Sequence, residues 1–290
     1  MEKRVVITGL GAVTPVGIGK ENFYNALLEG KSGIGPITRF DASDYATRIA
    51  GEVKDFDITQ YGVDKKEARR MDRSVEFAIG AAVLAADDAK LALDEEDLDR
   101  CGTVVGTGIG GIDSIHEVYT TLFDKGPGRV SPFAVPMMIA NMSSARVSIR
   151  LGLKGPVITD VTACTSGTNA IGDAFRIIQR GDADIMFAGG TEAAVSPAAV
   201  AGFAAMKAMS TRNDEPTKAS RPFDKDRDGF VMGEGAGIVV LEELEHAKAR
   251  GAHIYAEVVG YGTNGDAYHI TAPAPGGVQA RKCMELAIKD

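Results

Sequence analysis

The stretch VITDVTACTSGTNAIGDAFRIIQRGDADIMFAGG, Val157 to Gly190, decides the fold of this chain. Its apolar beginning predicts a strand over 157–162, and apolar residues at helical spacing predict a helix over 166–179. A glycine directly after this helix marks its end, and a second strand is predicted over 185–188. A strand, a turn, a helix and another strand in succession are typical of an α/β protein.

The rest of the chain repeats this alternation, which favours α/β layering throughout. Further strands are predicted at 5–8, 103–105, 237–242 and 255–260. Further helices are predicted at 21–29, 72–90, 112–123 and 244–250, and from near Val278 onward. The last helical pattern reaches the final residue without a capping glycine or a following strand. We therefore expect the sequence to be a fragment.

Composition limits the function classes that fit. A chain of 290 residues suits one large or two ordinary domains, and 44% hydrophobic with 25% charged residues is typical of a soluble globular enzyme. The formal net charge of −8, without a basic tail, argues against a general nucleic-acid binder. No apolar run approaches the ~20 residues that span a bilayer. The short apolar run at 5–8, soon broken by glycine, favours a strand over a signal peptide.

The three cysteines are Cys101, Cys164 and Cys283. Their odd number, wide spacing and lack of a CxxC pattern argue against a disulfide framework and against a zinc site. A reducing compartment fits this usage, so we expect a cytoplasmic location and no bound metal.

Cys164 stands between a predicted strand and a predicted helix. A helix N-terminus offers free N–H groups and partial positive charge, which favour a thiolate. A tight turn there would lift the sulfur out of the sheet, as the nucleophile elbow does for serine in hydrolases, and its N–H could bind an oxyanion. We interpret Cys164 as a nucleophile, with a buried, inert thiol as the alternative. Cys101 and Cys283 lack this setting and are predicted to be structural.

A nucleophilic thiol needs a base or an electrostatic partner, and the chain has four histidines. His116 falls within a predicted helix and suggests a surface or packing role. His246 and His253 flank a turn and are predicted to be solvated. His269 lies in a loop of turn-forming residues and is the one histidine that we consider near an active site. Sequence spacing pairs none of them with Cys164.

Two glycine-containing motifs match known ligand-binding motifs only in part. GTGIGG at 106–111 fits the dinucleotide fingerprint, but no acidic residue closes a second strand about 20 residues later. DKDRDGFVMGEG, which begins at Asp224, resembles a calcium loop. Its twelfth position is Gly235 instead of a bidentate glutamate, and no helix follows. We therefore expect neither a nucleotide cofactor nor a calcium ion, and we interpret the second motif as a charged turn.

Several motifs in order resemble the beta-ketoacyl-acyl-carrier-protein synthases, most closely the synthase II group of these condensing enzymes. The motifs are VTACTSGTNAIGDA, TGLGAVTPVG, GTGIGG, GDADIMFAGGTEA, STRND, SRPFDKDRDGFVMGEGAG, LEELEHAKARGA and DAYHITAPAP. The resemblance covers essentially all 290 residues. It implies a thiolase-like α/β fold of two related halves in five layers, αβαβα. Residues 1–251 would form the first half, and residues 252–290 would begin an incomplete second half. The resemblance also implies a homodimer formed through the first half.

The reaction that the resemblance implies is a decarboxylative Claisen condensation, which lengthens a fatty acid by two carbons. The thiolate takes an acyl group from acyl carrier protein, and the carbanion left when malonyl-acyl-carrier-protein loses carbon dioxide attacks this acyl group. Both steps need stabilisation of a negative oxygen, and no cofactor is implied. The alternatives are a polyketide ketosynthase, a non-catalytic partner such as a chain-length factor, and a fragment that folds or dimerises without activity.

Matched residue by residue, the family nucleophile falls on Cys164. The resemblance implies an acyl pocket with Ile109 and Phe203, and a loop at Phe133 and Ala134 that reaches the pocket of the partner subunit. The family often has a bulkier residue where Ala134 stands, which leaves chain-length preference open.

The resemblance also implies contacts with the carrier protein. Thr271 matches a position near the pantetheine arm. The basic patch that docks the acidic carrier protein matches Lys66, Arg69, Arg70, Arg129 and Lys207. From the residues alone, the charge run 65–73 is a solvated helix start.

The two catalytic histidines of the family lie in N-A-H-G-T and G-H-x-x-G-A motifs, which a full-length member carries beyond position 290. Neither motif occurs here, nor does the later glycine-rich loop that supplies a second oxyanion donor. None of the four histidines present replaces them. We therefore expect this chain to carry the nucleophile part of a Cys-His-His site and to be a truncated sequence of an active enzyme.

Overall fold

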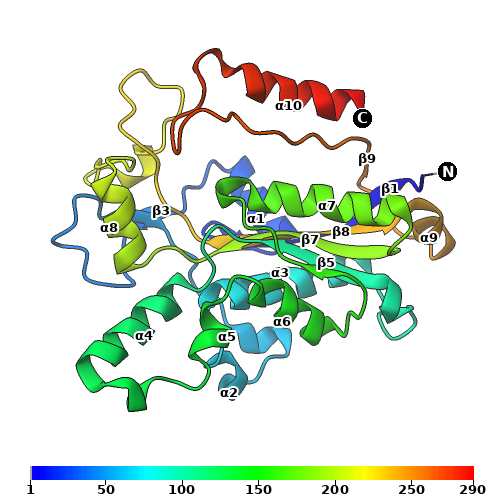
Figure 1. The fold of residues 1–290 in the computed structure, drawn as a ribbon, viewed down its shortest axis with the longest axis horizontal. Helices are drawn as coiled ribbons and strands as arrows, with labels where there is room; N and C mark the ends of the chain where they lie inside the picture. Colours follow the sequence, from blue (N-terminus) through cyan, green and yellow to red (C-terminus); the bar gives the residue numbers. More distant parts are fainter. Residues whose placement is uncertain (1) are drawn as a thin grey trace.

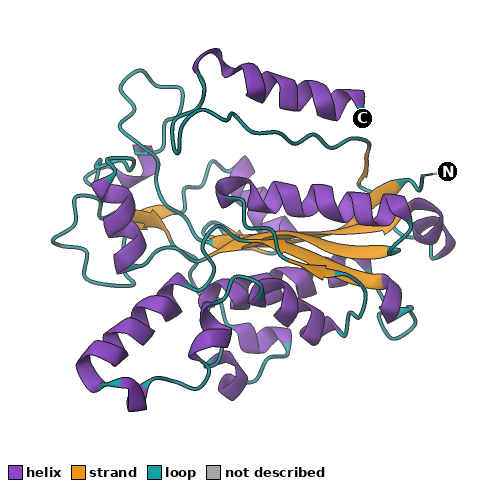
Figure 2. Cartoon of the chain, in the orientation of Figure 1, coloured by secondary structure: helices purple, strands orange, loops and turns teal. Residues whose placement is uncertain are grey.

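A seven-stranded mixed sheet organises the fold (Figure 2), in a computed structural model that describes residues 2–290. The strand order is β2-β1-β8-β7-β5-β6, and β9 pairs with β1 beside this path. The strands are β1 (Val5–Thr14), β2 (Gly17–Ile18), β5 (Cys101–Gly106), β6 (Val157–Ile158), β7 (Ile185–Glu192), β8 (Gly235–Glu243) and β9 (Ala256–Val258). A separate ribbon pairs β3 (Ile34–Pro36) with β4 (Ile49–Gly51).

The strand directions place three loops at one edge of the sheet. Strands β5, β6 and β7 run parallel, and β8 is antiparallel to both β7 and β1. The carboxyl ends of parallel strands meet at the same edge. The chain therefore leaves β5 after Gly106, β6 after Ile158 and β7 after Glu192 in one neighbourhood.

Helices cover both faces of the sheet (Figure 1). They are α1 (Lys20–Leu28), α2 (Lys65–Ala68), α3 (Arg73–Ala89), α4 (Ile112–Lys125), α5 (Ala134–Met138), α6 (Met142–Leu151), α7 (Ser166–Arg180), α8 (Pro197–Ala205), α9 (Leu244–Ala249) and α10 (Val278–Lys289). Helices α3 and α6 lie on one face, and α7 lies on the other. The result is three layers, α, β and α.

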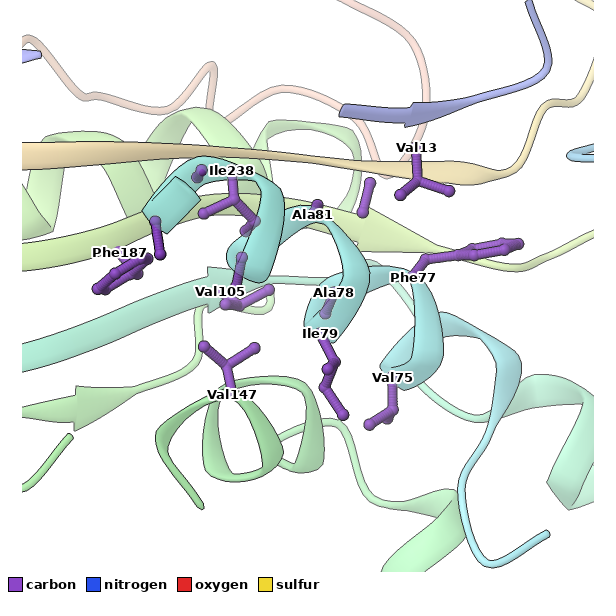
Figure 3. Packing of buried hydrophobic residues seen from close by; sticks show 14 of the residues in the cluster. Val13, Val75, Phe77, Ala78, Ile79, Ala81, Val105, Val147, Phe187 and Ile238 are labelled. Atoms are coloured by element: carbon purple, nitrogen blue, oxygen red, sulfur yellow. The ribbon is translucent and has the colours of Figure 1, made fainter. Parts of the chain in front are cut away.

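Helix α3 packs closely on the sheet because both surfaces carry small residues (Figure 3). A Cβ atom on Gly11 of β1 would lie 1.9 Å from the carbonyl oxygen of Ala81, so this contact needs bare backbone. Phe77 and Phe187 are fully buried around it, and Val147 of α6 closes the cluster. Burial of each such large side chain stabilises the fold by about 1.5–3 kcal/mol.

Helix α7 packs its apolar stripe on the opposite face of the sheet. Ala170, Ala174, Phe175 and Ile178 contact a cluster that contains Val104, Met186 and Leu241. The helix ends at Gly181, whose φ of +86° lets its N–H reach two carbonyls of the last turn. The predicted end of this helix is confirmed.

The predicted helices are all present, and their bounds differ from the predicted ones by two residues or fewer. The length of the predicted strand over 157–162 is wrong, because β6 holds only Val157 and Ile158. Strand β6 is an edge strand that pairs with β5 alone, so the following residues leave the sheet to reach α7. The sequence did not predict α5, α6, α8 or the β3–β4 ribbon.

None of residues 252–290 is buried: after β9 has paired with β1, residues 259–290 pass over α7 on its side away from the sheet (Figure 1). Tyr261 touches the helix, where its hydroxyl accepts a hydrogen bond from the side chain of Asn169 at 3.0 Å. Asp290, at the end of α10, pairs with Arg176 at 2.5 Å. Within residues 2–290, no helix combines the length and the apolar character that a membrane crossing requires.

Candidate active site

Cys164 lies in a single 3-10 turn, Ala163–Thr165, that leads directly into α7. The residue before it, Ala163, has a φ of +55°, a left-handed conformation that costs free energy for a residue with a Cβ atom. The chain therefore bends sharply just before the sulfur, as the sequence predicts for a nucleophile elbow. Cys164 is exposed, so the alternative of a buried thiol is wrong.

The hydroxyl of Ser166 holds this turn together. It accepts the N–H of Thr162 at 2.9 Å and lies 2.6 Å from the carbonyl oxygen of Ala163. It also lies 3.1 Å from the carbonyl oxygen of Thr107, in the loop after β5. Ser166 is 3% exposed, so these bonds are shielded from water. One buried hydroxyl thus joins the Cys164 turn to the neighbouring loop.

Glycine brings the first turn of α7 against the strand ends. A Cβ atom on Gly106, the last residue of β5, would lie 2.2 Å from the carbonyl oxygen of Ser166. A Cβ atom on Gly167 would lie 3.3 Å from the backbone of Gly190 in β7. In the GTGIGG motif, Gly106 therefore permits a close approach of two backbones at the Cys164 turn.

The start of α7 can stabilise negative charge beside Cys164. The hydrogen bonds described for residues 2–290 leave the N–H of Cys164 without an acceptor. The helix dipole adds partial positive charge at the same place. A thiolate, or an oxygen that becomes negative during acyl transfer, would be stabilised here.

Glu192, which the sequence analysis did not single out, lies at the end of β7. Its carboxylate accepts the N–H of Gly108 at 2.6 Å and the N–H of Ile109 at 3.1 Å, and the Thr107 hydroxyl at 3.2 Å. Burial raises the pKa of Glu192, while these three hydrogen bonds oppose the rise. The available signal was an acidic residue at the end of a largely buried strand.

The predicted acyl-pocket residues come from two neighbouring elements. Ile109 lies in the loop after β5 and is 38% exposed. Phe203 lies on α8, where its ring packs edge to face against Phe230 with centroids 5.3 Å apart. Ile112, at the start of α4, packs in the same apolar cluster as Phe203. Helix α4 thus connects the loop that carries Ile109 to the helix that carries Phe203.

The predicted partner-reaching loop touches one of the predicted docking residues. The guanidinium of Arg70 lies over the ring of Phe133, 4.3 Å from its centroid, which is a cation–π contact. Phe133 is half-buried, and the neighbouring Ala134 is buried within its own chain.

The other predicted docking residues are exposed at separate elements. Lys66 lies on α2 and Arg69 directly follows it, and both are exposed. Arg129 is exposed after α4, which contacts that segment. Lys207 follows α8 and lines a surface hollow of about 540 Å³ whose other lining residues include Arg221.

His269 closes its own loop, because its Nδ1 atom accepts the N–H groups of Thr271 and Ala272 at 3.1 and 3.0 Å. Thr271 itself is exposed. His116 is exposed on α4, and His253 packs edge to face against a tyrosine. In the part of the chain that the structure describes, no hydrogen bond links a histidine to the Cys164 side chain.

The prediction that His246 is solvated is wrong. Its Nδ1 lies 2.6 Å from the fully buried carboxylate of Glu242, and its Nε2 lies 3.0 Å from Glu96. Arg250 pairs with the same Glu242 through two hydrogen bonds of 2.7 Å. Helix α9 turns back over β8, so positions that flank an apparent surface turn meet a buried acid. This cluster lies at the end of β8, where it links α9 to the sheet.

The two other cysteines have local partners. Cys101 is buried, which raises the pKa of its thiol to about 12, and its sulfur contacts the Asp97 carbonyl at 3.3 Å. Cys283 is half-buried, and its thiol donates to the Gly262 carbonyl at 3.2 Å. Both observations fit the structural role predicted for them.

The motif that resembles a calcium loop forms a turn that enters β8. The Asp224 side chain accepts the N–H of Asp226 at 2.7 Å, and Glu234 pairs with Arg73 at 2.8 Å. Within residues 2–290, no group of three His, Cys, Asp or Glu side chains is arranged to hold a metal ion.

Sequence comparison identifies the relatives of this chain. Residues 2–247 match the model of the beta-ketoacyl synthase N-terminal domain. The chain is 59% identical over 289 residues to 3-oxoacyl-[acyl-carrier-protein] synthase 2 of Synechocystis sp., covering 100% of this chain and 69% of that relative. It is 55% identical over 288 residues to the protein of the same name from Staphylococcus aureus, covering 99% of this chain and 69% of that relative.

Solved structures agree with the sequence matches. A beta-ketoacyl synthase from Burkholderia phymatum superposes with a TM-score of 0.90 at 38% identity, covering 99% of this chain and 70% of that one. A type II polyketide ketosynthase, solved in complex with its acyl carrier protein, superposes with a TM-score of 0.89 at 33% identity, covering 100% and 70%. The predicted thiolase-like α/β fold is confirmed. The chain belongs to the beta-ketoacyl synthase family.

Proposed function

We propose that this chain carries the acyl-accepting nucleophile of a beta-ketoacyl-acyl-carrier-protein synthase that elongates fatty acids by two carbons. The observation that carries the proposal is Cys164, an exposed thiol at a strained turn before a helix N-terminus. The shared name of the relatives at 54–59% identity supports fatty-acid synthesis over a polyketide pathway. The retained cysteine argues against a non-catalytic chain-length factor.

In the proposed reaction, the Cys164 thiolate attacks the thioester carbonyl of acyl carrier protein. A carbon–sulfur bond forms to Cys164, and the pantetheine thiolate of the carrier leaves and takes up a proton. Malonyl-acyl-carrier-protein then loses carbon dioxide, and its carbanion attacks the acyl carbon. The bond to Cys164 breaks, so the free thiolate and a chain two carbons longer are produced. The Cys164 N–H supplies one oxyanion donor in the acyl-transfer step.

We place the acyl group between the loop after β5 and helix α8, with Ile109 and Phe203 as lining residues. The exposure of Ile109 and the edge-to-face packing of Phe203 support this position. Phe133 would reach the pocket of a partner subunit, with Ala134 behind it in its own chain, and Thr271 would lie beside the pantetheine arm.

Carrier-protein docking would use cationic side chains that lie on separate elements of an otherwise acidic chain. The proposed contact residues are Lys66, Arg69, Arg70, Arg129 and Lys207. Cationic side chains on a protein of net charge −8 would attract an acidic partner to the surface around them. The complex formed by the related polyketide ketosynthase with its own carrier protein supports this class of partner. A cytoplasmic location stays a prediction from the cysteine usage.

We also propose a homodimer through the edge strand β6. Val157, Ile158 and Val161 are 42%, 43% and 54% exposed, and an apolar edge strand with one neighbour is a template for pairing with another chain. A stable monomer in light scattering at micromolar concentration would overturn the dimer.

The lack of buried residues in 252–290 supports the division into a compact part, 1–251, and the start of a second part, 252–290.

The test of the proposed function is the intact mass of the chain after incubation with an acyl-acyl-carrier-protein thioester. Two further proteins run beside it: Cys164→Ala, and a chimera completed with the remaining C-terminal part of the Synechocystis relative. An acyl adduct that is absent from Cys164→Ala supports the proposal. An adduct on the chimera alone keeps the function but shows that loading needs the added part. No adduct on either protein overturns the proposal.

A further inference from the structure

The loop after β5, residues 107–111, is held by a single carboxylate. Both oxygens of Glu192 bind this loop: one accepts two successive N–H groups, of Gly108 and Ile109, and the other accepts the Thr107 hydroxyl. Among residues 2–290, no salt bridge involves Glu192. The hydrogen bonds described for its side chain are all directed at this loop.

The loop is confined between this carboxylate and the turn that carries the nucleophile. A Cβ atom on Gly108 would lie 2.9 Å from the nearer Glu192 oxygen and 3.6 Å from the carbonyl oxygen of Ala163, the residue before Cys164. Thr107 is tied from the other side, because its N–H donates to the Asp160 carbonyl at 3.0 Å and its carbonyl lies within bonding distance of Ser166. A displacement of the loop would therefore change the space beside Cys164.

A buried carboxylate at this place costs free energy that a neutral anchor of the loop would not. Burial opposes its charge, and no cation compensates for it within residues 2–290. Hydrogen bonds from N–H groups to a charged acceptor are shorter and stronger than neutral ones, and the 2.6 Å bond from Gly108 is of this kind. The arrangement therefore favours one loop position strongly, at the point where Ile109 stands.

We propose that Glu192 is a positioning residue that fixes Ile109 beside the Cys164 turn and so sets which acyl chain lengths reach the thiol. Glu192 does not touch the acyl group. It acts through the backbone N–H groups of Gly108 and Ile109. This inference rests on the proposed function, because it assigns the substrate selectivity of the same site.

Three substitutions separate positioning from general stability. Glu192→Ala removes both acceptors, whereas Glu192→Gln keeps an oxygen in reach of the two N–H groups. Glu52→Ala is the matched control, since Glu52 also accepts two successive backbone N–H groups, of Thr38 and Arg39, and the Thr38 hydroxyl, but holds a different loop. Glu192→Ala and Glu52→Ala thus remove the same set of hydrogen bonds, each from a different loop.

The readout is the rate at which N-alkylmaleimides with two to twelve carbons modify Cys164, followed by intact mass with Cys164→Ala as the blank. We expect Glu192→Ala to change the ratio of long-chain to short-chain rates by about tenfold, the effect of roughly one charge-assisted hydrogen bond. Glu52→Ala should keep the wild-type ratio, and Glu192→Gln, which keeps the acceptor oxygen but loses its charge, should lie between wild type and Glu192→Ala. Folding is checked for each variant by its urea unfolding midpoint.

An unchanged ratio in folded Glu192→Ala would overturn the inference, as would an equal change in Glu52→Ala. If Glu192→Ala does not fold, Glu192→Asp replaces it, because a carboxylate one methylene shorter cannot reach both N–H groups. An unchanged ratio in Glu192→Asp would then overturn the inference. Acyl transfer from the carrier protein is measured separately on the same variants, each built into the chimera that carries the C-terminal part of the Synechocystis relative. Absence of transfer from every form overturns the proposed function, whereas transfer with one common chain-length profile overturns only the role of Glu192.

Discussion

Replacing Gly106 with alanine should destabilise the fold and disturb the nucleophile turn together. The added Cβ atom would lie 2.2 Å from the carbonyl oxygen of Ser166 and 2.3 Å from its carbonyl carbon. Ordinary contact begins at about 3.4 Å, so one backbone must move by roughly 1 Å. Because both opposing atoms belong to the backbone at the junction with α7, no side-chain rotation relieves the clash. We expect a cost near the upper end for overpacking, about 3 kcal/mol.

The assay is equilibrium unfolding in urea, with Gly237→Ala as the matched control. Gly237 lies in β8 of the same sheet, and a Cβ atom there would meet nothing within 4 Å. At a slope of about 3 kcal/mol per molar urea, Gly106→Ala should lower the midpoint by roughly 1 M. Gly237→Ala should leave stability unchanged or raise it by up to about 1 kcal/mol. Equal midpoints for the two variants would refute the close-approach argument.

Three further predictions concern titratable groups. Burial lowers the pKa of His246, but two neighbouring glutamates outweigh burial, so the pKa is raised. The protonated ring therefore contributes its full stabilisation below pH 6.5, and this stabilisation is lost as the pH rises through the raised pKa. Urea midpoints of wild type and His246→Asn should differ more at pH 6 than at pH 9, and a constant difference would contradict this. Arg73→Met leaves the buried Glu234 carboxylate without its cation and should cost about 3 kcal/mol in urea unfolding, so a loss below about 1 kcal/mol would contradict the importance of the pair. Asp160 has a buried oxygen without a partner, and burial and Asp173 raise its pKa, so its charge destabilises the fold at neutral pH and less at acidic pH. Asp160→Asn should gain about 1 kcal/mol at pH 7.5 and less at pH 4 in thermal melts, and no gain at pH 7.5 would be the contrary result.

The spacing of apolar residues predicted the long elements well, because each of them buries either one face or nearly all of its side chains. Helices α3 and α7 carry apolar stripes that match their contacts with the two faces of the sheet. Strand β7 is an apolar run, and six of its eight residues are buried. Tertiary context decided the elements that were missed or shortened. Strand β6 keeps only two residues because it has one neighbour, and the apolar segment before α7 is used for the turn instead.

A site residue could be predicted only where its chemistry and the local secondary structure around it both point to the same role. Cys164 was accessible to sequence reasoning because a strand–helix junction positions a thiol at a helix N-terminus. Glu192 was not, since its partners are 83–85 residues earlier in the chain and depend on the parallel pairing of β5 with β7. His246 was misjudged for the same reason: Glu96, 150 residues away, meets it only in the folded chain.

Mass mapping of the acylated chain tests the central claim most directly. The chain is incubated with an acyl-acyl-carrier-protein thioester, digested, and searched for the acyl group on each of its three cysteine peptides. The account predicts acylation of the Cys164 peptide, with Cys101 protected by burial and Cys283 unmodified. An acyl group on Cys283 or Cys101 in place of Cys164 would contradict the account, because the turn before α7 would then not be the nucleophile site.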